Sequence, residues 1–289
     1  LEVDDAALGV GDRRVVLRGD VAHLRPTDLG EQIAQGARLG VRIAGLLDNT
    51  GGLIAGNHGL TLGAARLANA GGQIEAATGS AHLSTDFFDN ASGRLFAATN
   101  FTLRGGELAN GSGSLYAGRD ATLALSGALQ HDGVIAAARH LDVSAARINA
   151  SSGSLLAAGL QTDGHLAEAG SLNVQASSAI TAHGQHLAAG ALSLSAPALD
   201  LGSSLNAADA IRLSADTLSL SGANVRAETT LNAQAGDLLD TRAAHVSAAE
   251  LSLHARRLDN TGGDLRQTGS GALHIALPGA LTNTGGQIH

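Results

Sequence analysis

The stretch LDNTGGLIAG, residues 47–56, carries the pattern that decides the fold, and the chain repeats it at a nearly constant spacing. Each copy reads apolar residue, any residue, Asn, small residue, Gly or Ser, Gly, any residue, apolar residue. A fixed period of about 20 residues indicates a repeat architecture, in which one small structural unit is stacked many times. The other clear copies are LANAGGQIEA (67–76), FDNASGRLFA (88–97), LANGSGSLYA (108–117), LDNTGGDLRQ (258–267) and LTNTGGQIH (281–289).

Three series of apolar residues run through the chain in phase with this repeat, and all three contain one longer step between residues 143 and 187. One register with one insertion therefore accounts for the chain from about residue 43 onward. The first series is Leu47, Leu67, Phe88, Leu108, Leu129, Ile148, Ile180, Leu199, Leu218, Leu239, Leu258 and Leu281. The second is Ile54, Ile74, Leu95, Leu115, Ile135, Leu155, Leu187, Leu205, Val225, Val246, Leu265 and Ile288. The third is Ile43, Leu62, Leu83, Leu103, Leu123, Val143, Val174, Leu194, Leu213, Ala233, Leu253 and Ile275.

Apolar and polar residues alternate within each repeat, as in LTL (60–62), LDV (141–143) and IRL (211–213), which predicts strands with one buried side. A helical solenoid is disfavoured, because each interior Gly costs a helix about 1 kcal/mol. A repeat of about 20 residues is long enough for three short strands and three turns, which make one coil of a parallel β-helix. Coils stacked at about 4.8 Å turn each series into a column of like side chains, and about twelve of them make a rod of about 58 Å.

The Asn and Gly residues of the repeat are assigned to a turn. Asn tolerates left-handed backbone, and the amides of Asn49, Asn69, Asn90 and Asn110 can form hydrogen bonds along the stack. We expect the Gly pairs, such as Gly71 and Gly72, to lie where a Cβ atom would clash.

The composition agrees with a narrow core and excludes several functions. The chain of 289 residues has no Trp, Met or Cys, one Tyr and four Phe, yet is 44% hydrophobic, so its core must be built from Ala, Leu, Val and Ile. Without Cys it can form neither disulfides nor thiolate metal sites. A net charge of −8 and the absence of Lys disfavour nucleic acid as a partner. No apolar run approaches the roughly 18 residues of a membrane span.

The LDNTGG and LTNTGGQI segments and their period resemble the filamentous haemagglutinin repeats of very large bacterial surface proteins secreted by the two-partner route. That family includes filamentous adhesins and the stalks of contact-dependent inhibition toxins. The resemblance covers about residues 43–289. It implies a right-handed parallel β-helix exposed outside a Gram-negative cell, and an outer-membrane secretion partner for the full-length protein. Because the secretion-domain signatures of the family are not visible, we expect an internal shaft segment.

Two regions follow from this register: degenerate or opening coils in residues 1–42, and a regular β-helix of about 12 coils in residues 43–289, with a loop insertion near residues 159–171. The first region contains the tripeptide Arg18, Gly19 and Asp20, which is the integrin-binding motif of many matrix proteins. Val15 to Leu17 are predicted as a strand that ends at Arg18, which places Gly19 at or near an exposed turn.

Other candidate sites are weaker. Phe96 and Tyr116 each follow an inward residue, so they are expected to point outward one coil apart, as a small contact patch for a glycan or protein or as an incidental surface pair. The insertion contains Asp163, His165 and Glu168 and is interpreted as a solvated loop. The motif HGQH at residues 183–186 lacks a second pair of ligands, so no metal site is predicted.

The sequence favours a non-enzymatic role. The acidic residues do not recur in one column, and no nucleophile elbow or phosphate loop is present, so neither catalytic residues nor a cofactor is predicted. We expect a shaft that attaches a bacterium to host cells through a surface receptor, either an integrin or a glycan. The alternatives are the stalk or receptor-recognition region of a contact-dependent inhibition toxin filament and, third, a β-helix enzyme acting on polysaccharides.

Overall fold

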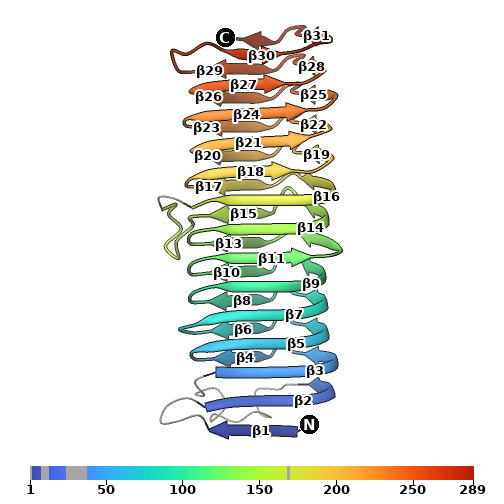
Figure 1. Ribbon diagram of the computed structural model, residues 1–289, viewed down its shortest axis with the longest axis vertical. Helices are drawn as coiled ribbons and strands as arrows, with labels where there is room; N and C mark the ends of the chain where they lie inside the picture. Colours follow the sequence, from blue (N-terminus) through green and yellow to red (C-terminus); the bar gives the residue numbers. More distant parts are fainter. Residues whose placement is uncertain (1, 8–12, 24–37, 168–169) are drawn as a thin grey trace.

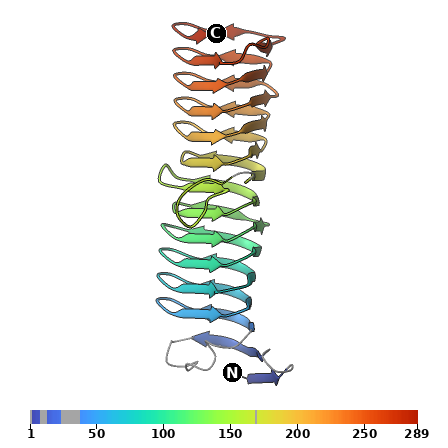
Figure 2. The ribbon, with the colours of Figure 1, turned by 90° about the vertical axis from the view of Figure 1, so that its left-hand side faces the viewer.

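The protein is a rod of stacked β-coils, shown by a computed structural model in Figures 1 and 2. The structure describes residues 2–7, 13–23, 38–167 and 170–289, and for the first two of these ranges it describes the backbone alone. The described residues contain no helix, and therefore none that is long and apolar enough to cross a membrane. The predicted all-β parallel solenoid with coils of about 20 residues is confirmed.

Each coil has three straight segments, called here faces 1, 2 and 3. Faces 1 and 2 belong to one twenty-stranded sheet that bends between them, and face 3 is a separate twelve-stranded sheet. The strands of face 3 are β4 (Leu53–Gly56), β6 (Gln73–Ala76), β8 (Arg94–Ala97), β10 (Ser114–Ala117), β13 (Val134–Ala137), β15 (Leu155–Ala158), β17 (Gln185–Ala188), β20 (Leu205–Ala208), β23 (Asn224–Ala227), β26 (His245–Ala248), β29 (Asp264–Gln267) and β32 (Gln287–Ile288).

Faces 1 and 2 are joined by one long strand in some coils and are formed by two shorter strands in others. The long strands are β2 (Arg13–His23), β3 (Arg38–Asp48), β5 (Gly59–Ala68), β7 (Ser80–Asp89), β9 (Phe101–Asn110), β14 (Leu141–Ala150) and β16 (Leu172–Ala182). The paired strands are β11 (Ala121–Leu125) with β12 (Ala128–His131), β18 (Ala191–Ser195) with β19 (Ala198–Asp200), β21 (Ala210–Ala215) with β22 (Thr217–Ser219), β24 (Thr230–Ala235) with β25 (Leu238–Asp240), β27 (Glu250–His254) with β28 (Arg257–Asp259), and β30 (His274–Ala276) with β31 (Leu281–Thr282). The sheet also contains β1 (Glu2–Ala7), which runs antiparallel to β2.

The stacking places like residues directly above one another, because parallel strands pair residue by residue. On face 2 the first predicted series is confirmed at all its positions, from the Leu47–Leu67 pair to the Leu258–Leu281 pair. These side chains are almost completely buried up to Leu258, whereas Leu281 in the last coil is 50% exposed. One column of apolar side chains, aliphatic except for Phe88, therefore runs from Leu47 to Leu281.

The second series is wrong at three positions. Ile135 pairs with Leu156, which pairs with His186, and His186 pairs with Asn206. The predicted members Leu155, Leu187 and Leu205 are each displaced by one residue and lie on the outer side, where Leu205 is 38% exposed. A shift of one residue moves a side chain to the opposite side of a strand. The prediction failed because it chose an outward apolar residue in each of these coils. In two coils the inward residue is polar, and in the third the inward residue and its outward neighbour are both Leu.

The third series is wrong at its first member only. Val41, rather than Ile43, pairs with Leu62, and from Leu62 to Ile275 the predicted order holds. Ile43 is nevertheless buried, beside the bend between faces 1 and 2.

Face 1 contributes a further inward column that the repeat comparison missed. It begins Leu39, Leu60, Ala81, Phe101, Ala121. The large Phe101 ring lies between two Ala side chains, and all three residues are almost completely buried. Close packing requires that volume be conserved over neighbouring positions, so the small residues directly above and below make room for the ring. The column was missed because its members vary so much in size.

The Asn residues of the repeat form a buried ladder at the turn between faces 2 and 3. The Nδ2 atom of each Asn donates to the Oδ1 atom of the next: Asn49 to Asn69 at 2.6 Å, Asn69 to Asn90 at 2.8 Å and Asn90 to Asn110 at 2.7 Å. Each of these side chains is fully buried and also contacts a backbone carbonyl within its own turn. Buried amides require such partners, and the predicted role of Asn is confirmed.

The two Gly positions of the turn, which in one coil are Gly71 and Gly72, have different roles. The repeat pattern alone did not separate these roles. At the first position the backbone is left-handed, with φ of +61° at Gly71 and +53° at Ser92, and a Cβ atom on Gly71 would meet open space. At the second position the constraint is space: a Cβ atom on Gly72 would lie 2.1 Å from the backbone oxygen of Asn49. In the coils of the Asn ladder Ser therefore replaces Gly only at the first position, whereas Ser204 stands at the second position in a coil where Leu201 replaces the Asn.

We predict that Gly113→Ala destabilises the rod by about 3 kcal/mol, because the new Cβ would lie 2.1 Å from the Asn90 carbonyl oxygen. Gly111→Ala, in the same turn, is the matched control, since nothing lies within 4 Å of its Cβ position. Urea unfolding of both variants measures the difference, and equal stabilities would contradict the steric role of Gly113.

The corrected register predicts that replacing Leu by Gln changes the free energy of unfolding unequally at two positions of one coil. Leu205→Gln should change the free energy of unfolding by less than about 0.5 kcal/mol, because the side chain faces outward. Leu199→Gln places an amide in the apolar column of face 2 and should cost about 3 kcal/mol or more. Thermal or urea unfolding distinguishes the two, and the reverse order would restore the original assignment of Leu205 to the core.

Candidate functional surfaces

The Arg-Gly-Asp tripeptide lies inside strand β2, where the strand bends. In register, Arg18 pairs with Arg42 and Gly19 with Ile43, and the pairing is irregular between Gly19 and Val21. The prediction that the strand ends at Arg18 is wrong, because β2 continues to His23. It passes from face 1 to face 2 without a break, as β3 does beside it. Asp20 therefore lies at the irregularity in the bend rather than in a separate turn.

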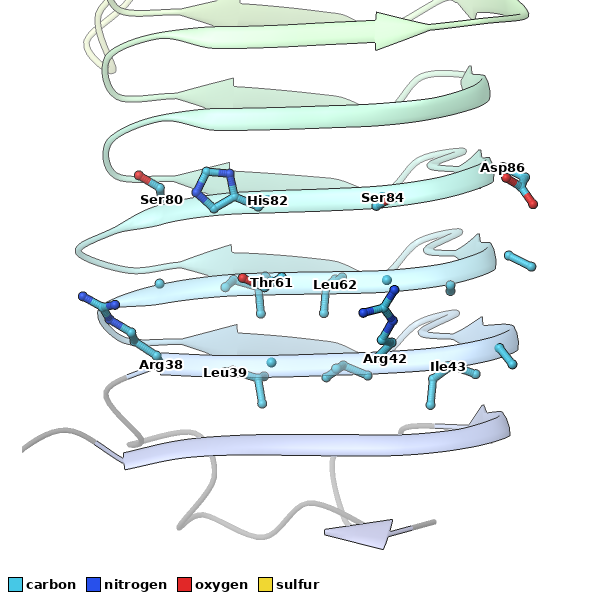
Figure 3. Close-up of a pocket in the computed structure, with 18 of the residues that line it drawn as sticks. Arg38, Leu39, Arg42, Ile43, Thr61, Leu62, Ser80, His82, Ser84 and Asp86 are labelled. Carbon is cyan, nitrogen blue, oxygen red and sulfur yellow. The ribbon is translucent and has the colours of Figure 1, made fainter. Parts of the chain in front are cut away.

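A hollow of about 1000 Å³ lies next to this bend, lined by residues of β3, β5 and β7. Figure 3 shows Arg38 and Arg42 on β3 and His82, Ser84 and Asp86 on β7. Between these strands the outward positions of β5 on face 1 are small, above all Gly63, whose missing side chain leaves room beside Arg42. Arg42 and Ile43, which pair with the tripeptide, also line the hollow. The tripeptide and the hollow thus occupy neighbouring coils.

The hollow was not predicted from the sequence. The available signal was the presence of Gly40, Gly59 and Gly63 at outward positions of two adjacent coils, where most other coils carry side chains. That signal is visible only once the register of face 1 is known.

Phe96 and Tyr116 lie side by side on the outer side of face 3. They pair in register on β8 and β10, both are half-buried, and their ring planes differ by 5° with centroids 5.9 Å apart. The guanidinium of Arg94 lies 5.8 Å from the centroid of the Phe96 ring, close enough for a cation–π contact. The pair is an aromatic surface with a basic edge.

The insertion folds back along the outside of the rod (Figure 2), and Leu160 in it contacts this surface. Tyr116 donates its hydroxyl to the Leu160 carbonyl at 3.1 Å, and the Gln161 side chain donates to the Ala138 carbonyl at 2.9 Å. Burial, and then the negative charge of Asp163, raise the pKa of Tyr116 above its usual value, so the phenol stays protonated and able to donate. Asp163 and His165 are exposed, and Glu168 lies outside the described residues.

The insertion also explains an apolar strip on face 3. In the two coils beside the insertion the outward residues Ala136 and Ala157 are at most 1% exposed. The corresponding residues of the other coils are half-buried or exposed. Around them lie the outward residues that had been assigned to the core, Leu155, Leu187 and Leu205, and Leu166 of the insertion is 44% exposed. The insertion therefore covers the middle of this strip, and Leu205 and Leu166 remain exposed at its edge.

The two His residues of the HGQH motif do not share a site. The Nε2 atom of His183 lies 3.3 Å from the Asp200 carboxylate on the outside of the rod, whereas His186 is completely buried in the core. His186 contacts Asn206, with Nδ1 and Oδ1 2.8 Å apart. Among the residues with described side chains, no group of three His, Cys, Asp or Glu could hold a metal ion.

A second buried imidazole, His131, stands at the position of the Asn ladder in the coil above Asn110. Its Nδ1 atom lies 3.2 Å from Nδ2 of Asn110, and its Nε2 atom lies 3.1 Å from the Leu155 carbonyl oxygen. Burial lowers the pKa of His131 and of His186 from 6.5 to about 4, so both are neutral at pH 7. Neither buried imidazole was recognised from the sequence, because a lone His in an apolar context has no specific pattern.

Comparison with known proteins places the whole rod among repeat proteins. A family model described as haemagglutinin repeat matches residues 30–87, 88–164, 153–200, 167–249 and 228–285. The toxin CdiA of Yersinia pestis is 30% identical over 234 residues, which are 79% of this chain but 6% of the toxin. The chain thus spans a small fraction of the length of this relative. No solved structure matches the chain significantly.

We predict that Tyr116→Phe loosens the insertion while leaving the coils intact, because it removes only the hydroxyl that donates to Leu160. Amide hydrogen exchange of residues 160–167 should accelerate about 5-fold, as expected for a hydrogen bond of about 1 kcal/mol. Phe87→Leu on face 2 is the control and should leave these amides unchanged. Unchanged exchange in Tyr116→Phe would mean that this bond does not hold the insertion.

Proposed function

Because the chain belongs to the haemagglutinin-repeat family, we propose that it is an internal shaft segment of a large bacterial surface adhesin, secreted by the two-partner route. The observation that carries this proposal is the family repeat, which covers nearly the whole chain and is built as an unbroken rod. In this proposal residues 43–289 form the regular shaft and residues 1–42 the opening coils. The family implies an outer-membrane secretion partner and a location outside the bacterial cell.

The physical properties of the rod suit a spacer. Neighbouring coils are joined by backbone hydrogen bonds on all three faces, and the aliphatic columns continue from coil to coil. Stability in such a solenoid comes from contacts between neighbouring coils, so length can be added without changing the core. A shaft of this kind holds binding surfaces at a distance from the cell.

Attachment to host cells is proposed to use the N-terminal part of this segment. The Arg18-Gly19-Asp20 tripeptide lies at a strand bend, beside the hollow lined by Arg38 and Arg42. Functional residues often lie where a rigid scaffold bends or carries loops. The partner is a host surface receptor, with an integrin as the first candidate. The Phe96–Tyr116 surface is a second proposed contact, for a glycan or a protein.

The proposal predicts that integrin-bearing host cells adhere to the immobilised chain, and that Asp20→Glu reduces adhesion at least about 10-fold, since short-motif recognition depends on the placement of that carboxylate. Asp209→Glu, an exposed acid in a distant coil, is the matched control and should adhere like the wild type. Equal adhesion of Asp20→Glu and wild type would remove the tripeptide from the proposal. If host cells adhere to none of the proteins, host attachment by this segment is refuted.

A second candidate is favoured by the similarity to toxin CdiA: the stalk or receptor-recognition region of a contact-dependent inhibition filament. The same rod would then present its surfaces to other bacteria. Binding of the labelled chain to bacterial cells, in the absence of binding to host cells, would support this candidate over the first.

We further propose that the segment is not an enzyme, because the repeat family is a structural one. The remaining alternative, a β-helix enzyme acting on polysaccharides, has only the general fold in its favour. Release of reducing sugars from a panel of acidic and neutral polysaccharides would establish it, and the shaft proposal expects none.

A further inference from the structure

Among the residues with described side chains, two imidazoles are buried in the core, both in the coils around the insertion. On face 3 the inward column is aliphatic from Ile54 to Leu156 and again from Val225 to Leu265. Between these stretches it contains His186 and Asn206, both completely buried. Two coils before His186, His131 occupies the Asn-ladder position with 2% exposure. We call His131, His186 and Asn206 the polar segment.

Hydrogen bonds fix the neutral form of His131. The Leu155 carbonyl can only accept, so Nε2 of His131 must carry the proton and donate to it. The other nitrogen, Nδ1, then accepts from the Asn110 amide and, at 3.5 Å, from the Gly133 N–H. A proton on Nδ1 would point an N–H group at the Asn110 amide and the Gly133 N–H, which are themselves donors. Protonation of His131 therefore breaks the end of the Asn ladder.

His186 is fixed in the same way by a one-directional chain. The Asn206 amide nitrogen donates to the Ser204 hydroxyl at 2.7 Å, which donates to the Leu201 carbonyl at 2.6 Å. The Asn206 oxygen is thus left to accept from Nδ1 of His186. The Nε2 atom of His186 is buried without a partner. A second proton would have to be placed on this atom, where no acceptor receives it, and a buried charge without partners is strongly unfavourable.

Among the described residues, no opposite charge in direct contact with either ring offsets this cost. The negative charge of Asp132 favours protonation of His131, but Asp132 is exposed to solvent at the next position of the chain. A charge on His131 would disfavour protonation of His186, because the two positive charges repel each other. The nearby His183–Asp200 pair lies on the outside of the rod. Burial is the main cause of the lowered pKa of both imidazoles, about 4 in each.

The Asn ladder is interrupted in the same coils. The Asn ladder stops at His131, and Ala150 and Ala182 occupy its next two positions. The insertion also separates these two coils in sequence, since Ala158 of β15 pairs with Ala188 of β17 across it. After His131 the ladder position therefore has no side-chain hydrogen bond between neighbouring coils, and the Ser151–Asp132 hydrogen bond lies on the exposed side of the same turn.

We propose that the coils of the polar segment form an acid-sensitive joint in the shaft: they are closed at neutral pH and open on protonation of His131 and His186, while the coils on either side remain folded. In the open state each imidazole has its ordinary pKa of 6.5, whereas in the closed state its pKa is about 4. The closed state therefore loses stability as the pH falls from 6.5 to about 4 and regains it as the pH rises. A change from 6.5 to about 4 corresponds to about a 300-fold larger opening equilibrium per imidazole.

The test is hydrogen exchange of the purified chain, followed by mass spectrometry at pH 7 and pH 4.5 and corrected for the intrinsic rate. Protection of peptides from residues 128–158 and 172–208 should fall at least about 50-fold at pH 4.5, while peptides from residues 60–110 keep theirs. Loss of protection along the whole rod, or no loss anywhere, would overturn the proposal.

Variants identify the groups responsible. His131→Asn places in the ladder the residue found in the four coils from Asn49 to Asn110, and should remove part of the acid response at pH 4.5. Adding His186→Val and Asn206→Val makes the face 3 column aliphatic and should abolish the rest. His254→Asn, at an exposed position on face 1, is the control and should respond like the wild type. A full acid response in His131→Asn combined with His186→Val and Asn206→Val would assign the joint to other groups.

Discussion

The structure depends on one constraint: parallel coils pair residue by residue at about 4.8 Å, so every side chain must fit between the two copies of its own position. Where the copies are alike, as in the column of Leu47 and Leu67, the fit follows from the repeat itself. Where they differ, volume is balanced along the column, as with Phe101 between Ala81 and Ala121. Polar positions obey the same rule, because a buried Asn can give its proton to the Asn above and accept from the Asn below.

This constraint explains how far the sequence could be interpreted. The fold, the coil length, the Asn turn and the face 2 column could be predicted because they recur with nearly identical residues. Face 3 was harder, because Leu155, Leu187 and Leu205 are apolar residues on its outer side, next to inward positions held in two of the three coils by His186 and Asn206. A rule that apolar residues point inward selects the wrong neighbour there. The local exceptions to the pattern mark an apolar outer surface and a polar core.

The candidate surfaces share an origin in departures from the repeat. The hollow exists because Gly occupies outward positions at Gly40, Gly59 and Gly63. The covered strip on face 3 exists because the insertion returns to the outside of the rod and Tyr116 holds it there. The tripeptide lies where the pairing of β2 with β3 becomes irregular. None of these features could be located before the register was known, because each is defined by its position relative to the coils above and below.

The Asn ladder has a direction, and this direction makes the two ends of any stack of coils chemically different. In each Asn–Asn hydrogen bond the N–H points toward the later coil. His131 closes the first ladder with a ring nitrogen that accepts, and Thr241 opens the next one with a hydroxyl that donates to Asn260 at 2.9 Å. The aligned amides add a dipole along the shaft, with its positive pole toward the later coils. Two such stacks meeting at like ends would set donor against donor or acceptor against acceptor, so head-to-tail addition is the sole polarity in which the ladder can be extended.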